Sequence, residues 1–78
     1  MDEAFFFDPM AFGVRVRQLR QERALSLLAL ANDAGISQCA LWKIETGTTQ
    51  NPSLLLILRL ADALGRTPPQ LLEWDIAP

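Results

Sequence analysis

The sequence predicts an all-α domain of five short helices, and three observations support this prediction. Apolar residues recur every three or four positions through most of the chain, which is the period of a helix with one buried face. Serine, threonine or aspartate precedes each of these apolar segments, as expected of helix N-caps. Glycine, which readily adopts the left-handed conformation of a helix end, follows three of them, at Gly35, Gly47 and Gly65.

The first eight residues are expected to form a leader that precedes the first helix. We expect one or two of the rings of Phe5, Phe6 and Phe7 to cover the core or a subunit partner. Asp8 is a good N-cap and Pro9 suits the first helical position, so the first helix is predicted to begin there and to end near residue 23 or 24. Its apolar stripe consists of Phe12, Val16 and Leu19.

Residues 26–47 are predicted to form two helices joined by a tight turn. Ser26 is the expected N-cap of the second helix, which runs to about residue 34. Gly35 suits a left-handed helix end, and Ser37 suits the N-cap of the third helix, which spans roughly residues 38–46. The positions expected to be buried are Leu30, Ala31 and Ala34, and Ile36 is expected to serve as an apolar anchor in the turn.

The third helix has two distinct faces. Leu41 and Ile44 are three residues apart and are expected to face inward, with Glu45 beside them. The outward residues are Gln38, Cys39, Trp42, Lys43 and Thr46. Two helices separated by a glycine turn, the second with an open outer face, form a shape that reads the major groove of DNA.

The C-terminal third of the sequence predicts two more helices. A polar loop, residues 48–51, leads to Pro52 and Ser53, which open the fourth helix, and Gly65 closes it. Its expected inward residues are Leu54, Ile57, Leu60, Ala61 and Leu64. Thr67 is expected to cap a short fifth helix that begins with Pro68 and Pro69. We therefore expect one domain over residues 9–73 and a C-terminal tail over residues 74–78.

Composition argues against several classes of protein. No apolar run approaches the roughly 18 residues of a membrane span, and an N-terminus carrying Asp2 and Glu3 does not resemble a secretory signal. Cys39 is the single cysteine and histidine is absent, which excludes an internal disulfide and a cysteine-based zinc cluster and favours a cytoplasmic protein. We find no nucleophile arrangement and no glycine-rich phosphate loop. The expectation is a protein that is not an enzyme and has no metal or cofactor.

The charge is unevenly distributed along the chain. The formal net charge is −2, but several acidic residues lie in the leader and the tail. Residues 9–72 carry seven basic and four acidic side chains, a net charge of +3. A small basic body of this kind can dock on phosphate, with an affinity that falls as salt rises.

The order and spacing of the motifs resemble those of the Cro and phage-repressor (XRE-type) helix-turn-helix family. The resemblance covers residues 13–72, most of the chain. The residues that carry it are Val16-Arg17-x-Leu19-Arg20, Leu25-Ser26, Leu30-Ala31, Ala34-Gly35-Ile36-Ser37, Leu41, Ile44-Glu45-x-Gly47, Pro52-Ser53-Leu54 and Leu60-Ala61-Asp62-Ala63-Leu64-Gly65.

The resemblance implies a compact, lambda-repressor-like fold of five helices, and it implies roles for individual residues. Arg20 and Glu45 match a structural ion pair between the first and third helices. The third helix corresponds to the recognition helix of the family, and base contacts are expected from its residues Gln38, Cys39, Trp42 and Lys43. Contacts to the DNA backbone are expected at Arg17, Arg23, Ser26, Ser37, Thr46, Thr48, Thr49 and Asn51.

Some positions differ from the family pattern and keep alternative interpretations. Leu27 follows Ser26 where the family usually has a phosphate-binding glutamine, and the loop after Gly47 lacks the usual Lys or Arg. Trp42 could contact a thymine methyl group or a sugar, or could pack against its neighbours. Cys39 could contact DNA, act as a thiol switch or be an unreactive filler.

The fourth helix predicts an interface between subunits. Leu55, Leu56 and Leu58 lie outside its inward stripe, and a helix that is apolar nearly all round must be covered on more than one side. In the family, dimers commonly form around the last helices, which makes Leu55, Leu58, Leu71, Leu72 and Trp74 the candidate contacts.

Two classes of function are consistent with these features. The first is a sequence-specific transcriptional regulator that binds double-stranded DNA as a homodimer on a palindromic operator. The second is an antitoxin-like or adaptor module of the same fold, which binds a partner protein through Leu27, Leu28 and Trp42.

Overall fold

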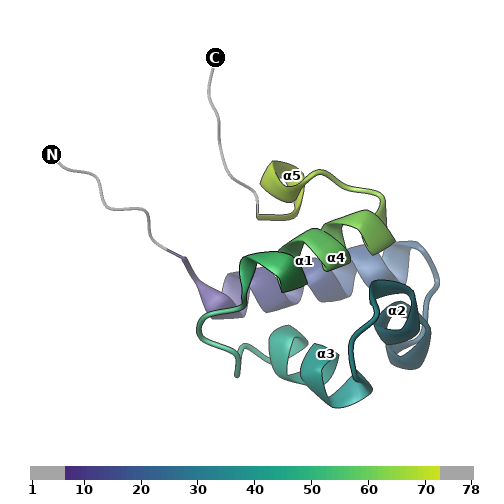
Figure 1. Cartoon of the computed structure of the whole chain (residues 1–78), viewed down its shortest axis with the longest axis horizontal. Helices are drawn as coiled ribbons and strands as arrows, with labels where there is room; N and C mark the ends of the chain where they lie inside the picture. The colour runs from purple at the N-terminus through teal and green to yellow at the C-terminus, as the bar shows by residue number, and fades with distance from the viewer. Residues whose placement is uncertain (1–6, 73–78) are drawn as a thin grey trace, which may run out of the picture.

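The computed structural model describes residues 7–72, and it contains five helices and no strand in that range (Figure 1). The order and the starts of all five helices agree with the prediction, and α1 and α3 end within a residue or two of it. The helices are α1 (Pro9–Glu22), α2 (Leu27–Ala34), α3 (Gln38–Glu45), α4 (Leu54–Leu64) and α5 (Pro68–Leu72). None of these helices is long and apolar enough to cross a membrane.

The five helices close a ring around one core. α1 packs against α3 on one side and against α5 on the other, while α2 packs against both α3 and α4, and α4 packs against α5 (Figure 1). The helix-turn-helix unit of α2 and α3 is therefore held from two directions. α1 supports α3, and α4 supports α2.

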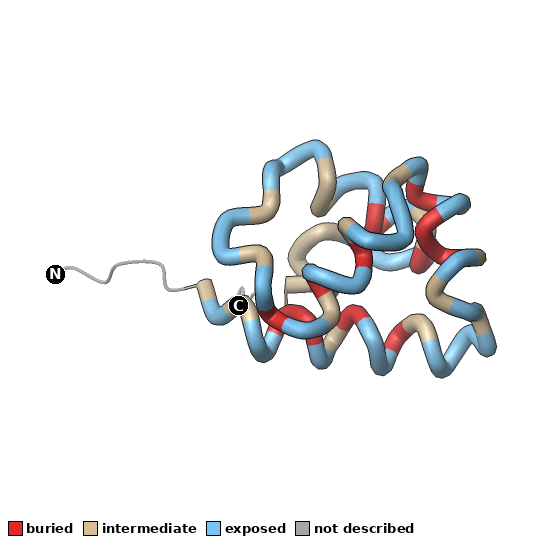
Figure 2. The backbone as a smooth tube through the Cα atoms, turned by 90° about the horizontal axis from the view of Figure 1, so that it is seen from below, coloured by how far each residue is buried: buried red, intermediate tan, exposed pale blue. Residues whose placement is uncertain are grey.

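Buried residues recur along the helices at the spacing that the sequence predicts (Figure 2), and those of the core are apolar. Every inward residue predicted for α1, α2 and α3 is buried. In α4 the prediction holds for the C-terminal half only. Ile57 is half-buried, and Leu54 is 70% exposed. The prediction for Leu54 was wrong because this first residue of α4 lies one turn beyond the core. The buried apolar residues are Phe12, Val16, Leu19, Leu30, Ala31, Ala34, Leu41, Ile44, Leu60, Ala61, Leu64 and Leu71.

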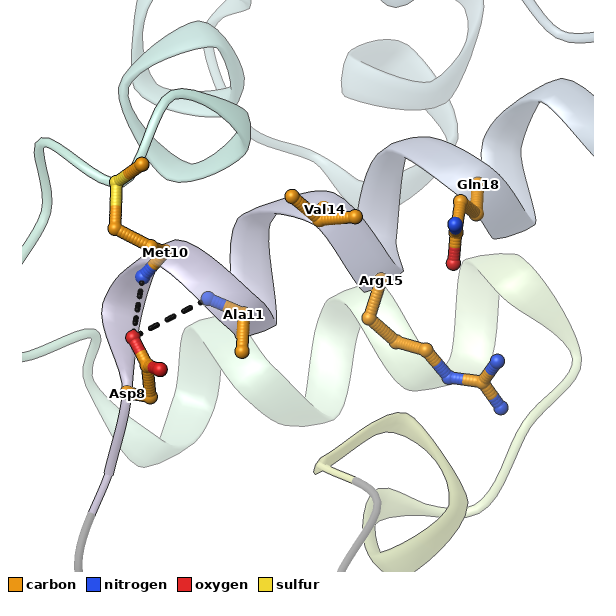
Figure 3. A pocket seen from close by; sticks show the side chains of 6 residues that line it. All are labelled: Asp8, Met10, Ala11, Val14, Arg15 and Gln18. Carbon is orange, nitrogen blue, oxygen red and sulfur yellow. Dashed lines mark hydrogen bonds between the residues drawn. The ribbon is translucent and has the colours of Figure 1, made fainter.

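Each helix begins at the side-chain cap that the sequence predicts. The Asp8 carboxylate accepts hydrogen bonds from the backbone N–H groups of Met10 and Ala11 at 3.0 and 3.3 Å (Figure 3). The hydroxyl groups of Ser26, Ser37 and Ser53 accept from the third N–H of their helices at 3.0–3.1 Å. At α5, Thr67 and Gln70 exchange side-chain and backbone hydrogen bonds as a capping box.

Gly35 ends α2 in the left-handed conformation, with a φ of 72°. Its N–H donates to the carbonyl oxygen of Asn32, and the N–H of Ile36 donates to that of Ala31. These two bonds form a Schellman motif, which closes a helix and reverses the chain within two residues. The motif fixes the angle at which α3 leaves α2.

The contact between α1 and α3 is close because Gly13 has no side chain. A Cβ on Gly13 would overlap the carbonyl oxygen of Ile44 and lie 2.7 Å from the carbonyl oxygen of Glu45. The C-terminal turn of α3 therefore rests directly on the backbone of α1. The sequence analysis did not single out this glycine.

An ion pair joins the same two helices, as the sequence predicts. Arg20 of α1 donates from Nε and from Nη2 to the two carboxylate oxygens of Glu45, at 2.7 and 3.0 Å. Arg20 also donates to the Leu25 carbonyl oxygen at 2.9 Å. The hydrogen bonds to Glu45 raise the pKa of Arg20, a shift that burial only partly opposes. The guanidinium therefore stays charged at neutral pH, and the pair would lose this contribution only in strong alkali.

Replacing Gly13 by alanine is expected to destabilise the domain by about 2 kcal/mol. The new methyl group forces α1 and α3 apart, and this overpacking outweighs the roughly 1 kcal/mol that alanine gains in helix propensity. Chemical denaturation followed by circular dichroism measures the difference. Gln18→Ala, an exposed change on α1, is the matched control and should have little effect. A Gly13→Ala variant as stable as the wild type would contradict the close contact.

Replacing Glu45 by alanine is expected to cost about 3 kcal/mol, because it leaves the partly buried Arg20 guanidinium without its carboxylate partner. Thermal unfolding measures this loss. Glu22→Ala removes an exposed carboxylate that lies 3.7 Å from Arg66, and it should change the stability by less than about 1 kcal/mol. Equal melting temperatures for the Glu45 and Glu22 variants would show that the pair does not secure α3.

Candidate nucleic-acid interface

The outer face of α3 is open. The inner residues Leu41 and Ile44 are buried, so the residues between them must point outward. α3 lies at the edge of the domain, on the side away from α4 and α5 (Figure 1). All five predicted outward residues are exposed, namely Gln38, Cys39, Trp42, Lys43 and Thr46.

The N-termini of α2 and α3 contribute backbone N–H groups near this face. Ser26 and Ser37 are exposed, and each hydroxyl accepts one N–H of the following helix. The first N–H groups of a helix have no partner within the helix and can bind an anion. Both predicted backbone-contact serines thus lie where a phosphate could meet helix N–H groups.

Arg17 lies next to the outer face of α3. Its side chain lines a shallow hollow of about 230 Å³ together with Leu27 of α2 and Trp42 and Thr46 of α3. Arg17 is exposed, and among residues 7–72 it has no hydrogen-bond or ion-pair partner. Lys43, in the last turn of α3, is exposed as well. Both of these predicted cations are therefore exposed, and Arg17 lines a hollow with residues of α3.

Arg23 does not line this hollow, and it makes a contact with α4 instead. Its guanidinium donates to the carbonyl oxygen of Leu64 at 3.2 Å, at the C-terminal end of α4. Unpaired carbonyl oxygens and the negative end of the helix dipole attract a cation there. Arg23 thus fastens the end of α1 to α4. The expected contact of Arg23 with the DNA backbone stays a prediction, because the side chain is exposed despite this bond.

The loop after α3 divides into two parts. The Thr46 hydroxyl donates to the Trp42 carbonyl oxygen at 2.9 Å and lies 3.0 Å from the Thr48 hydroxyl. The N–H groups of Thr48 and Thr49 both donate to the carbonyl oxygen of Lys43, at 2.8 and 3.2 Å. These three threonines are therefore fixed at the end of the exposed helix. Asn51 instead lines a separate hollow with Phe7, Pro52, Ile57 and Leu72, so the structure does not group it with them.

The predicted subunit contacts fall into three groups. Leu55 and Leu58 are 57% and 42% exposed on α4, and Leu54 adds to the same apolar surface. Leu72 is half-buried beside Ile57. Leu71 has no exposed surface and belongs to the core, so its assignment to a subunit interface was wrong. Its side chain is needed where α5 covers α1 and α4. Trp74 and the leader residues Phe5 and Phe6 lie outside the described residues.

Sequence reasoning missed an apolar surface on α1. Met10 and Val14 are 62% and 50% exposed, and together with Ala11, Arg15 and Gln18 they border a hollow of about 380 Å³ (Figure 3). Their spacing of four residues is a helical signal, but it lies outside the stripe that begins at Phe12. Among residues 7–72, no group of three or more Cys, Asp or Glu side chains is placed to hold a metal ion.

Comparison with known proteins agrees with this geometry. A model of the helix-turn-helix domain matches residues 11–74. The HTH-type transcriptional regulator DdrOP3 of Deinococcus deserti is 48% identical over 59 residues, which cover 76% of this chain and 45% of the relative. The chain spans less than half the length of the two curated relatives that it matches.

Solved structures agree as well. The restriction-modification controller protein C.AhdI of Aeromonas hydrophila is 39% identical, with a TM-score of 0.78 over 82% of this chain and 96% of that one. SinR of Bacillus subtilis, a master regulator for biofilm formation solved in complex with DNA, is 33% identical, with a TM-score of 0.75 over 78% of this chain and 97% of that one.

The helix caps, the glycine turn, the ion pair between α1 and α3 and these matches all point to the same conclusion. The chain belongs to the Cro and phage-repressor (XRE-type) helix-turn-helix family of transcriptional regulators.

Proposed function

We propose that this chain binds double-stranded DNA sequence-specifically through the outer face of α3 and regulates transcription as a homodimer on a palindromic operator. One observation supports the proposal above all others. The inner face of α3 is fixed to α1 by Gly13 and by the Arg20–Glu45 pair, while its whole outer face is open to solvent. A rigid support with an open helix is the arrangement that major-groove binding requires.

Gln38 and Lys43 are the proposed base-reading residues. A glutamine amide can form two hydrogen bonds to adenine in the major groove, and a lysine can reach guanine or a phosphate. The two residues are five positions apart on α3, about 7.5 Å along its axis. That separation corresponds to about two base-pair steps, so they would read different base pairs of one half-site.

The proposed backbone contacts surround these two residues. Ser26 and Ser37 offer helix N-termini, and Arg17 offers a positive charge. Thr46, Thr48 and Thr49 lie at the other end of α3. Basic side chains outnumber acidic ones over residues 9–72. These contacts can therefore neutralise phosphates although the whole chain carries a net negative charge.

The exposed leucines of α4 are the proposed dimer contacts. Leu54, Leu55 and Leu58 form an apolar surface beside the hollow that Phe7, Ile57 and Leu72 line. Isolated exposed leucines are ordinary, but three within one and a half turns form a patch. A second copy that presents the same patch would cover it with two-fold symmetry and place two copies of α3 on one side.

A protein partner is a second candidate function. Leu28 and Trp42 are 51% and 53% exposed on the helix-turn-helix unit. One solved neighbour, at 31% identity, is SinR in a complex with the SinI protein. An apolar surface on α2 and α3 would suit such a partner, and it would compete with DNA if both use α3.

Gln38→Ala and Lys43→Ala are expected to weaken DNA binding in different ways. The probe is a duplex selected by the wild-type protein from a randomised library, titrated at several salt concentrations. Gln38→Ala should cost about 1–3 kcal/mol and relax the preference at one base pair. If Lys43 contacts a phosphate, Lys43→Ala should lower the slope of log affinity against log salt concentration by about one.

Gln18→Ala and Arg66→Ala are the matched controls, since each removes the same kind of side chain from a surface away from α3. They should bind as the wild type does. Wild-type protein that selects no duplex, or that binds all duplexes equally, would contradict the proposed function.

Replacing both Leu55 and Leu58 by serine is expected to convert a dimer into a monomer without unfolding it, because both side chains are exposed within the single chain. Sedimentation velocity at micromolar concentration measures the mass. Leu28→Ser, an equally exposed leucine on α2, should leave the dimer intact. A wild-type protein that sediments as a monomer would remove the dimer from the proposal.

A further inference from the structure

The hollow beside the outer face of α3 is lined by two apolar and four charged or polar residues, and neither Gln38 nor Lys43 is among them. It lies between α1, α2 and α3 and has a volume of about 230 Å³. The residues that line it are Arg17, Arg20, Leu27, Trp42, Glu45 and Thr46. Trp42 is 53% exposed here, and Leu27 is half-buried.

Most polar groups around this hollow already have partners. Arg20 uses its guanidinium on Glu45 and on the Leu25 carbonyl oxygen. The Thr46 hydroxyl is hydrogen-bonded to the Trp42 carbonyl oxygen and lies next to the Thr48 hydroxyl. What remains for an occupant is the Leu27 side chain, the Trp42 indole and the charge of Arg17 at the rim. Leu27 and Trp42 suit a small apolar group, and Arg17 suits a negatively charged group that belongs to the same ligand.

The position of Trp42 restricts what that group can be. Trp42 lies four residues after Gln38, one helical turn or about 6 Å further along the same face of α3. A base at the hollow would therefore lie one or two steps from the base that Gln38 reads. The apolar group on a base edge in the major groove is the methyl group at C5 of thymine, and 5-methylcytosine carries the same group.

We infer that Leu27 and Trp42 form a receptor for the C5-methyl group of a pyrimidine, with Arg17 facing a phosphate of the same strand. The inference rests on the proposed DNA-binding function and specifies its base selectivity. Leu27 of α2 and Trp42 of α3 are the two apolar side chains that line the hollow.

The test compares duplexes that differ only in methyl groups. The full chain selects a duplex from a randomised library, and each thymine of that duplex is replaced in turn by uracil, which lacks the C5-methyl group. In a second set, each cytosine is replaced by 5-methylcytosine. Dissociation constants are measured for the wild type, Trp42→Ala and Leu27→Ala, and circular dichroism checks that each variant is folded. Lys43→Ala is the control that weakens binding without touching the hollow.

Replacing one such thymine by uracil should weaken wild-type binding about fourfold, the value of one buried methyl group. If the natural ligand is 5-methylcytosine, methylation at one position should strengthen binding by a similar factor instead. Either effect should vanish in Trp42→Ala and shrink in Leu27→Ala, and it should persist in Lys43→Ala.

Two results would overturn the inference. If neither modification changes the affinity of the wild type, the hollow does not hold a methyl group, and the proposed function survives. If the effect is the same in Trp42→Ala as in the wild type, another part of the protein reads the methyl group. A wild type that enriches no duplex would instead remove the proposed function itself, and with it this inference.

Discussion

The attachment of α3 to α1 is the constraint on which the rest of this structure depends. Gly13 lets the last turn of α3 rest on the α1 backbone. Two turns further along α1, Arg20 donates hydrogen bonds to both carboxylate oxygens of Glu45. The glycine sets how close the helices are, and the ion pair fixes their rotation. Together they bury Leu41 and Ile44 and leave the opposite face of α3 outside.

Arginine side chains at two other helix ends also stabilise this arrangement. Arg59 of α4 donates to the Gly35 carbonyl oxygen at 3.3 Å, at the turn where α2 ends. Arg23, the residue that follows α1, donates to the Leu64 carbonyl oxygen, at the end of α4. In both cases a guanidinium of one helix binds the C-terminal end of another, where carbonyl oxygens lack partners. Together with Arg20, these residues make three of the seven basic side chains of the chain that join one helix to another.

Local signals in the sequence predict the helices well, because caps and apolar stripes act within a few residues. Asp8, Ser26, Ser37 and Ser53 begin their helices as expected. The end of α1 carries no glycine, and Ala24 takes the left-handed conformation there with a φ of 57°. That exception explains why the end of α1 was the least sharply predicted boundary.

The predictions that failed needed knowledge of the tertiary arrangement. Leu54 and Leu71 both occur at helical spacing from other apolar residues, yet Leu54 is exposed and Leu71 is fully buried. The difference depends on where α5 crosses α1 and α4. The hydrogen bond from Arg23 to the Leu64 carbonyl oxygen also could not be foreseen, since it joins residues that lie far apart in the sequence. The hollow between Leu27 and Trp42 likewise joins residues fifteen positions apart, which no local pattern connects.

The most direct test of the account is a nuclear magnetic resonance titration of the labelled chain with its selected duplex. If α3 lies in the major groove, the largest amide shifts should fall on residues 38–46 and on the N-terminus of α2, with α4 changing little. Shifts concentrated on α4, or a duplex that leaves residues 38–46 unchanged, would contradict the central claim that α3 is held out to read DNA.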